Sequence, residues 1–173
     1  MGVDSLPETR GGVCRLVVRK KPDPSEILQY VIGGIEIGQQ IVVLATPTWL
    51  KDLARILGES GVRPETLIRN GRLIFMTAPN CLSRFTKSDD PMQRPPLRRN
   101  GCIVRWISDW SWAYGNGTDQ ATALSYQRRI HECIHGIAAL SVCTVHCENV
   151  ERSSMLAMLL HHRRSVRNHE RLV

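Results

Sequence analysis

The sequence lacks the features that membrane and secreted proteins carry. No apolar run approaches the roughly 18–20 residues that a helix needs to cross a bilayer, and the polar start MGVDSLPETRGG has no apolar signal-peptide region. Six cysteines among 173 residues are too sparse for a small disulfide scaffold, and several lie in apolar runs, where a thiol behaves as a small apolar group. We therefore expect a cytoplasmic protein that does not associate with a membrane.

Glycines and a lysine are missing where a nucleotide-binding protein would have them. Residues 41–45 (IVVLA) form an apolar run of strand length, Thr46-Pro47-Thr48 predicts a turn, and Leu50 opens an amphipathic stretch. Strand, turn and helix are the parts of a phosphate-binding loop, but such a loop needs G-x-x-x-x-G-K-[ST] so that backbone N–H groups can close on phosphate. This turn has no glycine, and Pro47 has no N–H. We expect neither nucleotide hydrolysis nor a bound cofactor.

Acidic residues are outnumbered by basic ones. The chain has 23 Lys and Arg against 16 Asp and Glu, for a net charge of +7. Much of the excess lies in Arg94, Arg98, Arg99 and the tail from Arg152 to Arg171. A basic surface attracts nucleic acid or acidic partners, but no helix-turn-helix or aromatic-interleaved pattern accompanies these residues. We interpret them as a solvated face and do not expect direct binding of nucleic acid.

Short apolar runs alternate with helical patterns along most of the chain. Apolar and β-branched residues predict strands at 13–19, 41–45, 72–77, 102–107 and 137–145, and helical periodicity predicts helices at 25–36, 50–58, 62–69, 120–134 and 153–162. Gly33-Gly34 in the first helix indicates close packing on a neighbour. Near-continuous apolar strands between helices are typical of a mainly parallel sheet covered on both faces, so we predict a three-layer α/β fold.

A single domain is expected, because a chain of this length suits one core. We predict that it spans residues 12–166, after a disordered leader at 1–11 and before a basic tail at 167–173. Three prolines and many charges predict an irregular, exposed loop or lid over residues 80–100.

Polar and aromatic residues follow the predicted strands. Ligands of parallel α/β sheets bind at the carboxyl ends of the strands, and these ends lie along one edge. The candidate ligand-binding residues are therefore Thr46, Pro47, Trp49, Thr77, Asp109, Trp110, Trp112 and His146. Two interpretations of Asp109 stay open: a turn or N-cap residue, and a polar contact to a ligand. Trp106, Trp110 and Trp112 alternate, which predicts one shared face of an extended segment, packed in the core or lining a pocket for an apolar molecule.

One segment matches a zinc-enzyme motif. His131–His135 has the H-E-x-x-H spacing that puts two histidines one helical turn apart, with Glu132 as general base. Arg128 and Arg129 lie just upstream, and Gly136 ends the helix at once. We interpret the match as a coincidental surface pattern.

A second set of residues has metal-binding chemistry. Cys143, His146 and Cys147 are spaced so that they could bind a metal together with His131 or His135. Because Cys143 falls inside a predicted strand, we favour a structural role for this set and predict no metal.

Five segments in order resemble one known family. They are GIEIGQQIVVLATP, GVRPETLIRNGRLIFMTA, VRWISDWSWA, SYQRRIHE and LSVCTVHCENVERSSMLAMLLHH. Together they resemble the MEDS domain (methanogen/methylotroph, DcmR-type sensory domain), a degenerate relative of the RecA/KaiC-like ATPases that lacks the phosphate loop. The resemblance implies a RecA-like three-layer fold and the sensing of a small organic or hydrocarbon-derived ligand upstream of transcription or signalling. The chain departs from the family in its Pro-rich stretch 89–99, in Asp109 where Glu is usual, and at Val145-His146 where a tyrosine is usual.

Three functional hypotheses follow. The first is a non-enzymatic sensory domain that binds a small molecule at the strand carboxyl ends, beneath the 80–100 loop. The second is a protein–protein interaction module without a small ligand, which associates with a regulatory partner or with itself as a homodimer. The third is a zinc metallohydrolase that uses His131, Glu132 and His135.

Overall fold

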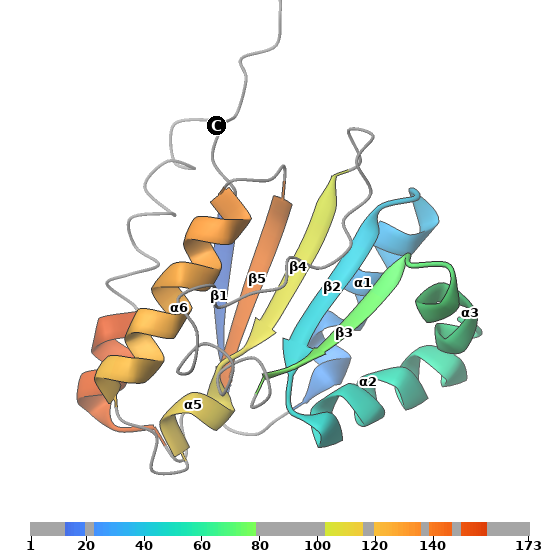
Figure 1. The fold of residues 1–173 in the computed structure, drawn as a ribbon. Coiled ribbons are helices and arrows are strands. Elements are labelled where there is room, and N and C mark those ends of the chain that lie inside the picture. The colour runs from blue at the N-terminus through green and yellow to red at the C-terminus, as the bar shows by residue number, and fades with distance from the viewer. Residues whose placement is uncertain are drawn as a thin grey trace, which may run out of the picture.

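A five-stranded sheet, parallel throughout, forms the centre of the molecule (Figure 1). The computed structural model describes residues 13–19, 23–78, 103–115, 120–135, 139–146 and 150–158. The strands are β1 (Val13–Arg19), β2 (Gln40–Ala45), β3 (Leu73–Thr77), β4 (Val104–Asp109) and β5 (Ala139–His146). Their order across the sheet is β1-β5-β4-β2-β3.

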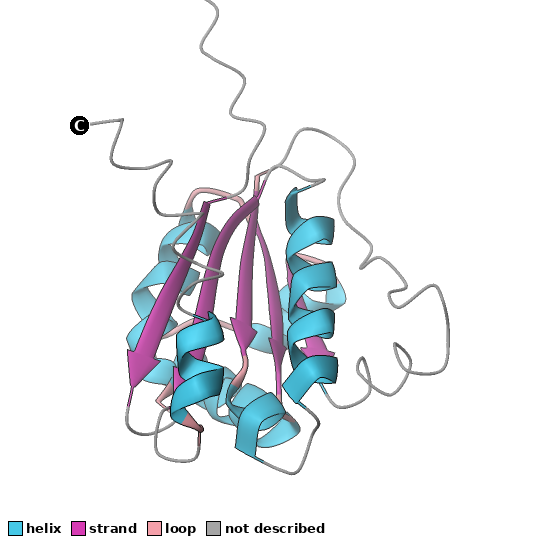
Figure 2. Cartoon of the chain, turned by 90° about the vertical axis from the view of Figure 1, so that its left-hand side faces the viewer, coloured by secondary structure: helices cyan, strands magenta, loops and turns pink. Residues whose placement is uncertain are grey.

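Helices cover both faces of this sheet (Figures 1 and 2). One layer contains η1 (Pro24–Ile27), α1 (Leu28–Glu36), α2 (Pro47–Glu59) and α3 (Pro64–Arg69). The opposite layer contains α6 (Gln120–His135) and the helical residues 152–158, while the short helix α5 (Ser111–Gly115) follows β4. The predicted three-layer α/β fold is confirmed, and it is compatible with the degenerate RecA-like architecture that the resemblance implies.

β2 is buried on both faces, which explains its unbroken apolar run from Ile41 to Ala45. Val42 and Leu44 belong to the core cluster under α6. Ile41 and Val43 belong to the cluster under α1 and α2. All four side chains are fully buried, and each contributes about 1.5–3 kcal/mol of transfer free energy to folding.

A close approach holds α1 on the sheet. A Cβ placed on Gly34 would lie 2.6 Å from both Arg105 Cδ and Ile41 Cδ1. The guanidinium of Arg105 stacks 4.5 Å from the ring centroid of Tyr30, and Arg105 Nε donates to Gln39 Oε1. The expectation of close packing is confirmed for Gly34.

The chain around β2 and β4 differs from the prediction in three ways. α2 begins at Pro47 rather than at Leu50, because Thr46 is its N-cap and accepts a hydrogen bond from the Trp49 backbone N–H at 3.4 Å. The predicted turn is therefore the start of the helix. Asp109 is the last residue of β4 rather than a residue beyond it.

The extended segment predicted for the tryptophans is wrong. Ser111 to Gly115 form α5, so Trp112 lies on a helix while Trp106 lies on β4. All three tryptophans nevertheless reach one core cluster, since the helical turn after Trp110 keeps Trp112 beside it.

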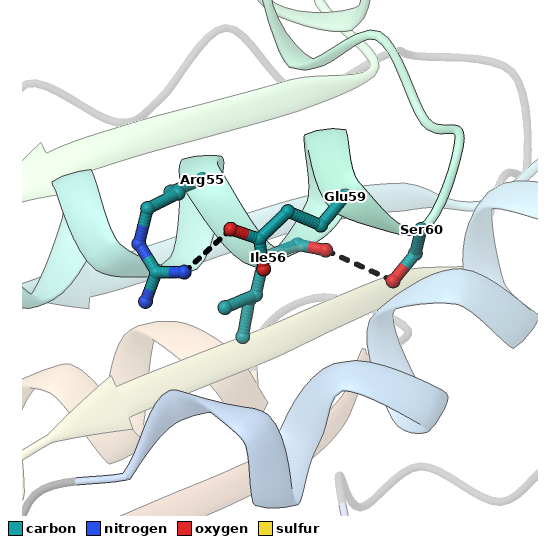
Figure 3. Close-up of polar contacts among 4 residues, drawn as sticks. All are labelled: Arg55, Ile56, Glu59 and Ser60. Carbon is teal, nitrogen blue, oxygen red and sulfur yellow. Dashed lines mark hydrogen bonds and ion pairs between the residues drawn. The ribbon is translucent and has the colours of Figure 1, made fainter.

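The far end of α2 is held by polar contacts at the surface (Figure 3). Arg55 and Glu59 form an exposed ion pair at 2.6 Å, and the Ser60 hydroxyl donates to the Ile56 carbonyl oxygen at 2.9 Å. These contacts lie away from the carboxyl end of β2, where α2 begins.

Several predictions fall on other parts of the chain. The leader at 1–11, the loop at 80–100 and the tail at 167–173 lie outside the described residues, as does the end of the helix predicted at 153–162. Within the described ranges, no helix has the length and apolar character needed to span a bilayer.

Candidate functional site at the carboxyl edge of the sheet

The register of the sheet brings the predicted site residues to one edge. Thr77 of β3 pairs with Ala45 of β2, and Asp109 of β4 pairs with Thr144 of β5. Leu44 pairs with Ser108, so Ala45 and Asp109 lie at the same level of neighbouring strands. Adjacent strands are about 4.8 Å apart. The carboxyl ends of β3, β2, β4 and β5 thus form one continuous row.

The strand order reverses at this edge between β2 and β4. From β2 the chain proceeds to β3 on one side, and it then returns to β4 on the other side of β2. The segments that leave β2 and β4 turn toward opposite faces, into α2 and α5 respectively (Figure 1). A reversal of this kind is the topological switch point at which open α/β sheets bind their ligands.

A buried carboxylate lies at the switch point. Asp109 is 2% exposed, and its Oδ1 accepts hydrogen bonds from the Ser111 hydroxyl at 2.7 Å and the Thr144 hydroxyl at 3.0 Å. The Trp110 backbone N–H donates to the Thr144 carbonyl oxygen at 2.8 Å and locks the strand end. Burial of a carboxylate is costly unless hydrogen bonds compensate it, so these hydroxyls hold Asp109 in one orientation.

Aromatic rings pack beneath this end of β4. Trp110 and Trp112 stack with ring centroids 6.4 Å apart, and Tyr126 of α6 meets them edge-on at 5.8 and 6.1 Å. The three rings are buried and belong to the core. Core packing is thus the observed role of Trp110 and Trp112, and they form the floor of the edge rather than its open surface.

Two indole N–H groups at the edge have no acceptor in the described part of the chain. They belong to Trp49 and Trp110, which follow β2 and β4 and are 5% and 0% exposed. By contrast, Trp106 Nε1 donates to Ser108 Oγ and Trp112 Nε1 donates to the Asp109 carbonyl oxygen. A buried donor without an acceptor costs about 1–3 kcal/mol, so the two strand ends at the switch point retain unused donor capacity.

The accessible side chains at the edge are small. Pro47 is exposed, whereas Thr46, Thr77 and Ser111 are half-buried. The start of α2 does not form a phosphate cradle, because two of its backbone N–H groups already have acceptors. The Trp49 N–H donates to the Thr46 hydroxyl, and the Leu50 N–H donates to the Thr46 carbonyl oxygen.

The H-E-x-x-H segment lies on α6, with His131 facing the sheet. His131 is 5% exposed, and its Nε2 lies 3.3 Å from the buried Cys143 Sγ of β5. The interpretation as a surface pattern is therefore wrong for His131, because its position on α6 faces the apolar core. The side chains of Glu132, His135 and His146 lie outside the described part.

The wider metal set finds no support among the described side chains, where no group of three or more His, Cys, Asp or Glu is arranged to hold an ion. Cys147 lies outside the described residues. The pair formed by His131 and Cys143 is the part of the set that the structure brings together.

Sequence reasoning missed two residues of the edge. Ser111 and Thr144 were not singled out, although their hydroxyls orient Asp109. Ser111 lies two residues after Asp109, a spacing at which a hydroxyl reaches back to a carboxylate. This contact could therefore have been predicted from the sequence. The contact of Thr144 with Asp109 could not have been predicted in this way, because it depends on the pairing of β4 with β5.

Comparison with known proteins adds no assignment: neither the scan against protein-family models nor the search of curated proteins gave a match.

Proposed function

We propose that this protein is a non-enzymatic ligand-binding domain of a cytoplasmic sensory or regulatory system, of the kind that the MEDS resemblance implies. The small molecule binds at the switch point between β2 and β4. The observation that carries the proposal is the combination of a strand-order reversal with a buried, oriented Asp109 at the same point.

The groups at the edge favour an organic molecule over a nucleotide. Asp109 is acidic. Pro47 has no backbone N–H, and the Thr46 hydroxyl already accepts the Trp49 N–H, so neither position offers a free backbone donor to a phosphate. The indole N–H groups of Trp49 and Trp110 have no acceptor among the residues that the structure describes, and they suit a neutral acceptor such as a carbonyl or ether oxygen. A small molecule with an apolar body and one or two polar atoms matches this set.

A thermal-shift screen of small organic molecules and nucleotides tests the proposal. We expect organic ligands to raise the unfolding temperature, and we expect the Asp109→Asn and Trp110→Phe variants to lose this shift. Arg55→Gln, at an exposed site on the far part of α2, serves as the matched control and should keep it. A large shift with ATP that Thr48→Ala abolishes would overturn the proposal.

A separate observation supports the second hypothesis, an interaction module without a small ligand. Among the described residues, five large apolar side chains are exposed. Three of them, Ile37, Ile103 and Leu140, lie at the amino ends of β2, β4 and β5, opposite the candidate site. Apolar groups gathered at one edge favour association.

Oligomeric state tests this second function. If the amino edge mediates self-association, light scattering should show a dimer that the double variant Ile37→Asp/Ile103→Asp converts to a monomer. A wild-type protein that stays monomeric at high concentration would contradict self-association by this edge.

A further inference from the structure

Most of the exposed apolar side chains lie around the amino edge of the sheet, opposite the candidate ligand site. Three of them lie at the amino ends of β2, β4 and β5, and a fourth lies in the last turn of α3, which leads into the start of β3 (Figure 1). They are Ile37, Ile103, Leu140 and Ile68, and their exposed fractions range from 39% to 67%. Among the large exposed apolar side chains that the structure describes, only Leu156 lies elsewhere. Such a concentration favours a surface that another molecule covers.

Three arginines lie among these apolar groups. Arg69 is exposed at the end of α3, whereas Arg72, just before β3, and Arg105, the second residue of β4, are half-buried. Arg72 Nη2 donates to the Ile35 carbonyl oxygen, and Arg105 Nη1 donates to the Tyr30 carbonyl oxygen. Both guanidinium groups therefore touch α1, so the starts of β3 and β4 and the helix between them form one surface.

The two half-buried arginines keep their positive charge. Neither Arg72 nor Arg105 pairs with a carboxylate in the described part of the chain, and their acceptors are carbonyl oxygens of α1 and the Gln39 side chain. A guanidinium has five N–H donors, of which these bonds use one or two. Solvent screens a half-buried charge less than an exposed one. A carboxylate brought to this edge would therefore form a favourable, charge-assisted hydrogen bond.

We propose that the amino edge binds an acidic, apolar segment of another protein. The apolar side chains of the segment cover the four exposed apolar groups, and its Asp or Glu carboxylates pair with the three arginines. Arginine beside apolar groups is typical of protein–protein interfaces. The inference rests on the second function proposed above, the interaction module, and names the chemistry of its partner. It does not depend on the ligand at the carboxyl edge.

A second copy of this chain fits the surface less well. A twofold dimer brings the same patch of both subunits together, so that arginines face arginines. Glu36, the last residue of α1, is exposed at this edge, but three arginines outnumber it. The whole chain also carries a net charge of +7, which opposes self-association. Charge complementarity therefore favours an acidic partner over a second copy.

Selection of peptides on the full chain tests the proposal. A displayed library of random peptides is selected at low salt on the wild-type protein, and an enriched peptide is synthesised for fluorescence anisotropy. We expect enriched peptides to combine Asp or Glu with Leu, Ile or Phe. Their affinity should weaken as salt is added, because ions screen the attraction between the carboxylates and the arginines.

Variants of exposed residues locate the binding surface without disturbing the fold. Ile37→Ser should weaken peptide binding about tenfold, because the partner then buries less apolar area. Arg69→Glu should weaken it at least about threefold and reduce its salt dependence. Leu156→Ser and Arg128→Glu are the matched controls, since they make equivalent changes at exposed positions in the opposite helix layer and should keep the affinity. Circular dichroism shows that each variant folds.

Three results would contradict the acidic partner. They are a selection that enriches no peptides or only neutral and basic ones, binding that the controls weaken as much as Ile37→Ser and Arg69→Glu do, and a wild-type dimer that Ile37→Ser converts to a monomer. The dimer would keep the interaction function and change its partner. Absence of both peptide binding and a dimer would remove that function, while the ligand at the carboxyl edge, tested by thermal shift, would still stand.

Discussion

The two edges of the sheet differ in which side chains they bury and which they expose. At the carboxyl edge, polar groups are buried: Asp109 is enclosed and held by the Ser111 and Thr144 hydroxyls. At the amino edge, apolar groups are exposed, and Ile37 is 67% accessible. Buried polar groups lower stability unless they are matched, and they are retained where they fix the orientation of a site. Exposed apolar groups need no such matching. The carboxyl edge thus holds oriented polar groups, which suits the ligand site proposed above, whereas the amino edge exposes apolar surface.

Removal of Asp109 should have the largest effect. Asp109→Ala leaves the Ser111 and Thr144 hydroxyls without their acceptor, so we expect the free energy of unfolding to fall by roughly 2–4 kcal/mol. Urea denaturation measures this change. Ile103→Ala at the amino edge is the matched comparison, because Ile103 is exposed and its truncation should change stability by about 0.5 kcal/mol or less. Equal effects of the two variants would contradict the contrast between the edges.

The carboxyl-edge half of this contrast was readable in the sequence, whereas the exposed apolar groups of the amino edge were not predicted. The run IVVLA predicted β2 because burial on both faces requires apolar residues at every position. The row of strand ends at Thr77 and Asp109 followed from the parallel sheet alone. The sequence therefore identified Thr77 and Asp109 at the edge, but it did not identify Ser111 and Thr144, the hydrogen-bond partners of Asp109.

The parts that sequence reasoning got wrong depend on weak local signals or on tertiary contact. α5 spans only five residues, so it has no helical periodicity to detect, and the alternating tryptophans imitated a strand. Thr46-Pro47 has the composition of both a turn and a helix start. The contact between His131 and Cys143 depends on how α6 docks on β5, which no spacing in the chain specifies.

Glycine substitutions on the two helices beside β2 should give effects of opposite sign. Gly34→Ala in α1 places a Cβ 2.6 Å from Arg105 Cδ and Ile41 Cδ1, and overpacking should cost roughly 1–3 kcal/mol. A Cβ added by Gly58→Ala in α2 meets no described atom within 4 Å beyond its chain neighbours and its own helix backbone, so better helix propensity should stabilise the protein by about 0.5–1 kcal/mol. Thermal unfolding compares the pair, and stabilisation by Gly34→Ala would show that α1 is free to shift on the sheet.

The tryptophans allow a test within the carboxyl edge itself. Trp112→Phe breaks the bond from its indole N–H to the Asp109 carbonyl oxygen, whereas Trp110→Phe removes a donor that has no acceptor among the described residues. Both changes shrink a buried ring, so the difference between them isolates the hydrogen bond. We expect Trp112→Phe to be the more destabilising by about 1 kcal/mol in chemical denaturation. The reverse order would mean that the Trp110 N–H is paired in the free protein.

The smallest effect concerns a carboxylate that is exposed, in contrast to Asp109. The hydroxyl and backbone N–H of Ser25 hold the pKa of Asp23 below its ordinary value of 3.8. Because the pKa is lower in the folded state, the charged form stabilises the fold; this contribution is complete above about pH 4 and is lost as the pH falls through the folded pKa.

Exposure to solvent limits the contribution of Asp23 to about 0.5 kcal/mol. Asp23→Asn keeps a capping oxygen but cannot titrate. Stability curves of wild type and Asp23→Asn should therefore run together at neutral pH, and only the wild type should lose this increment in acid. Parallel curves from pH 7 to pH 2 would show that the cap at the start of η1 does not form in solution.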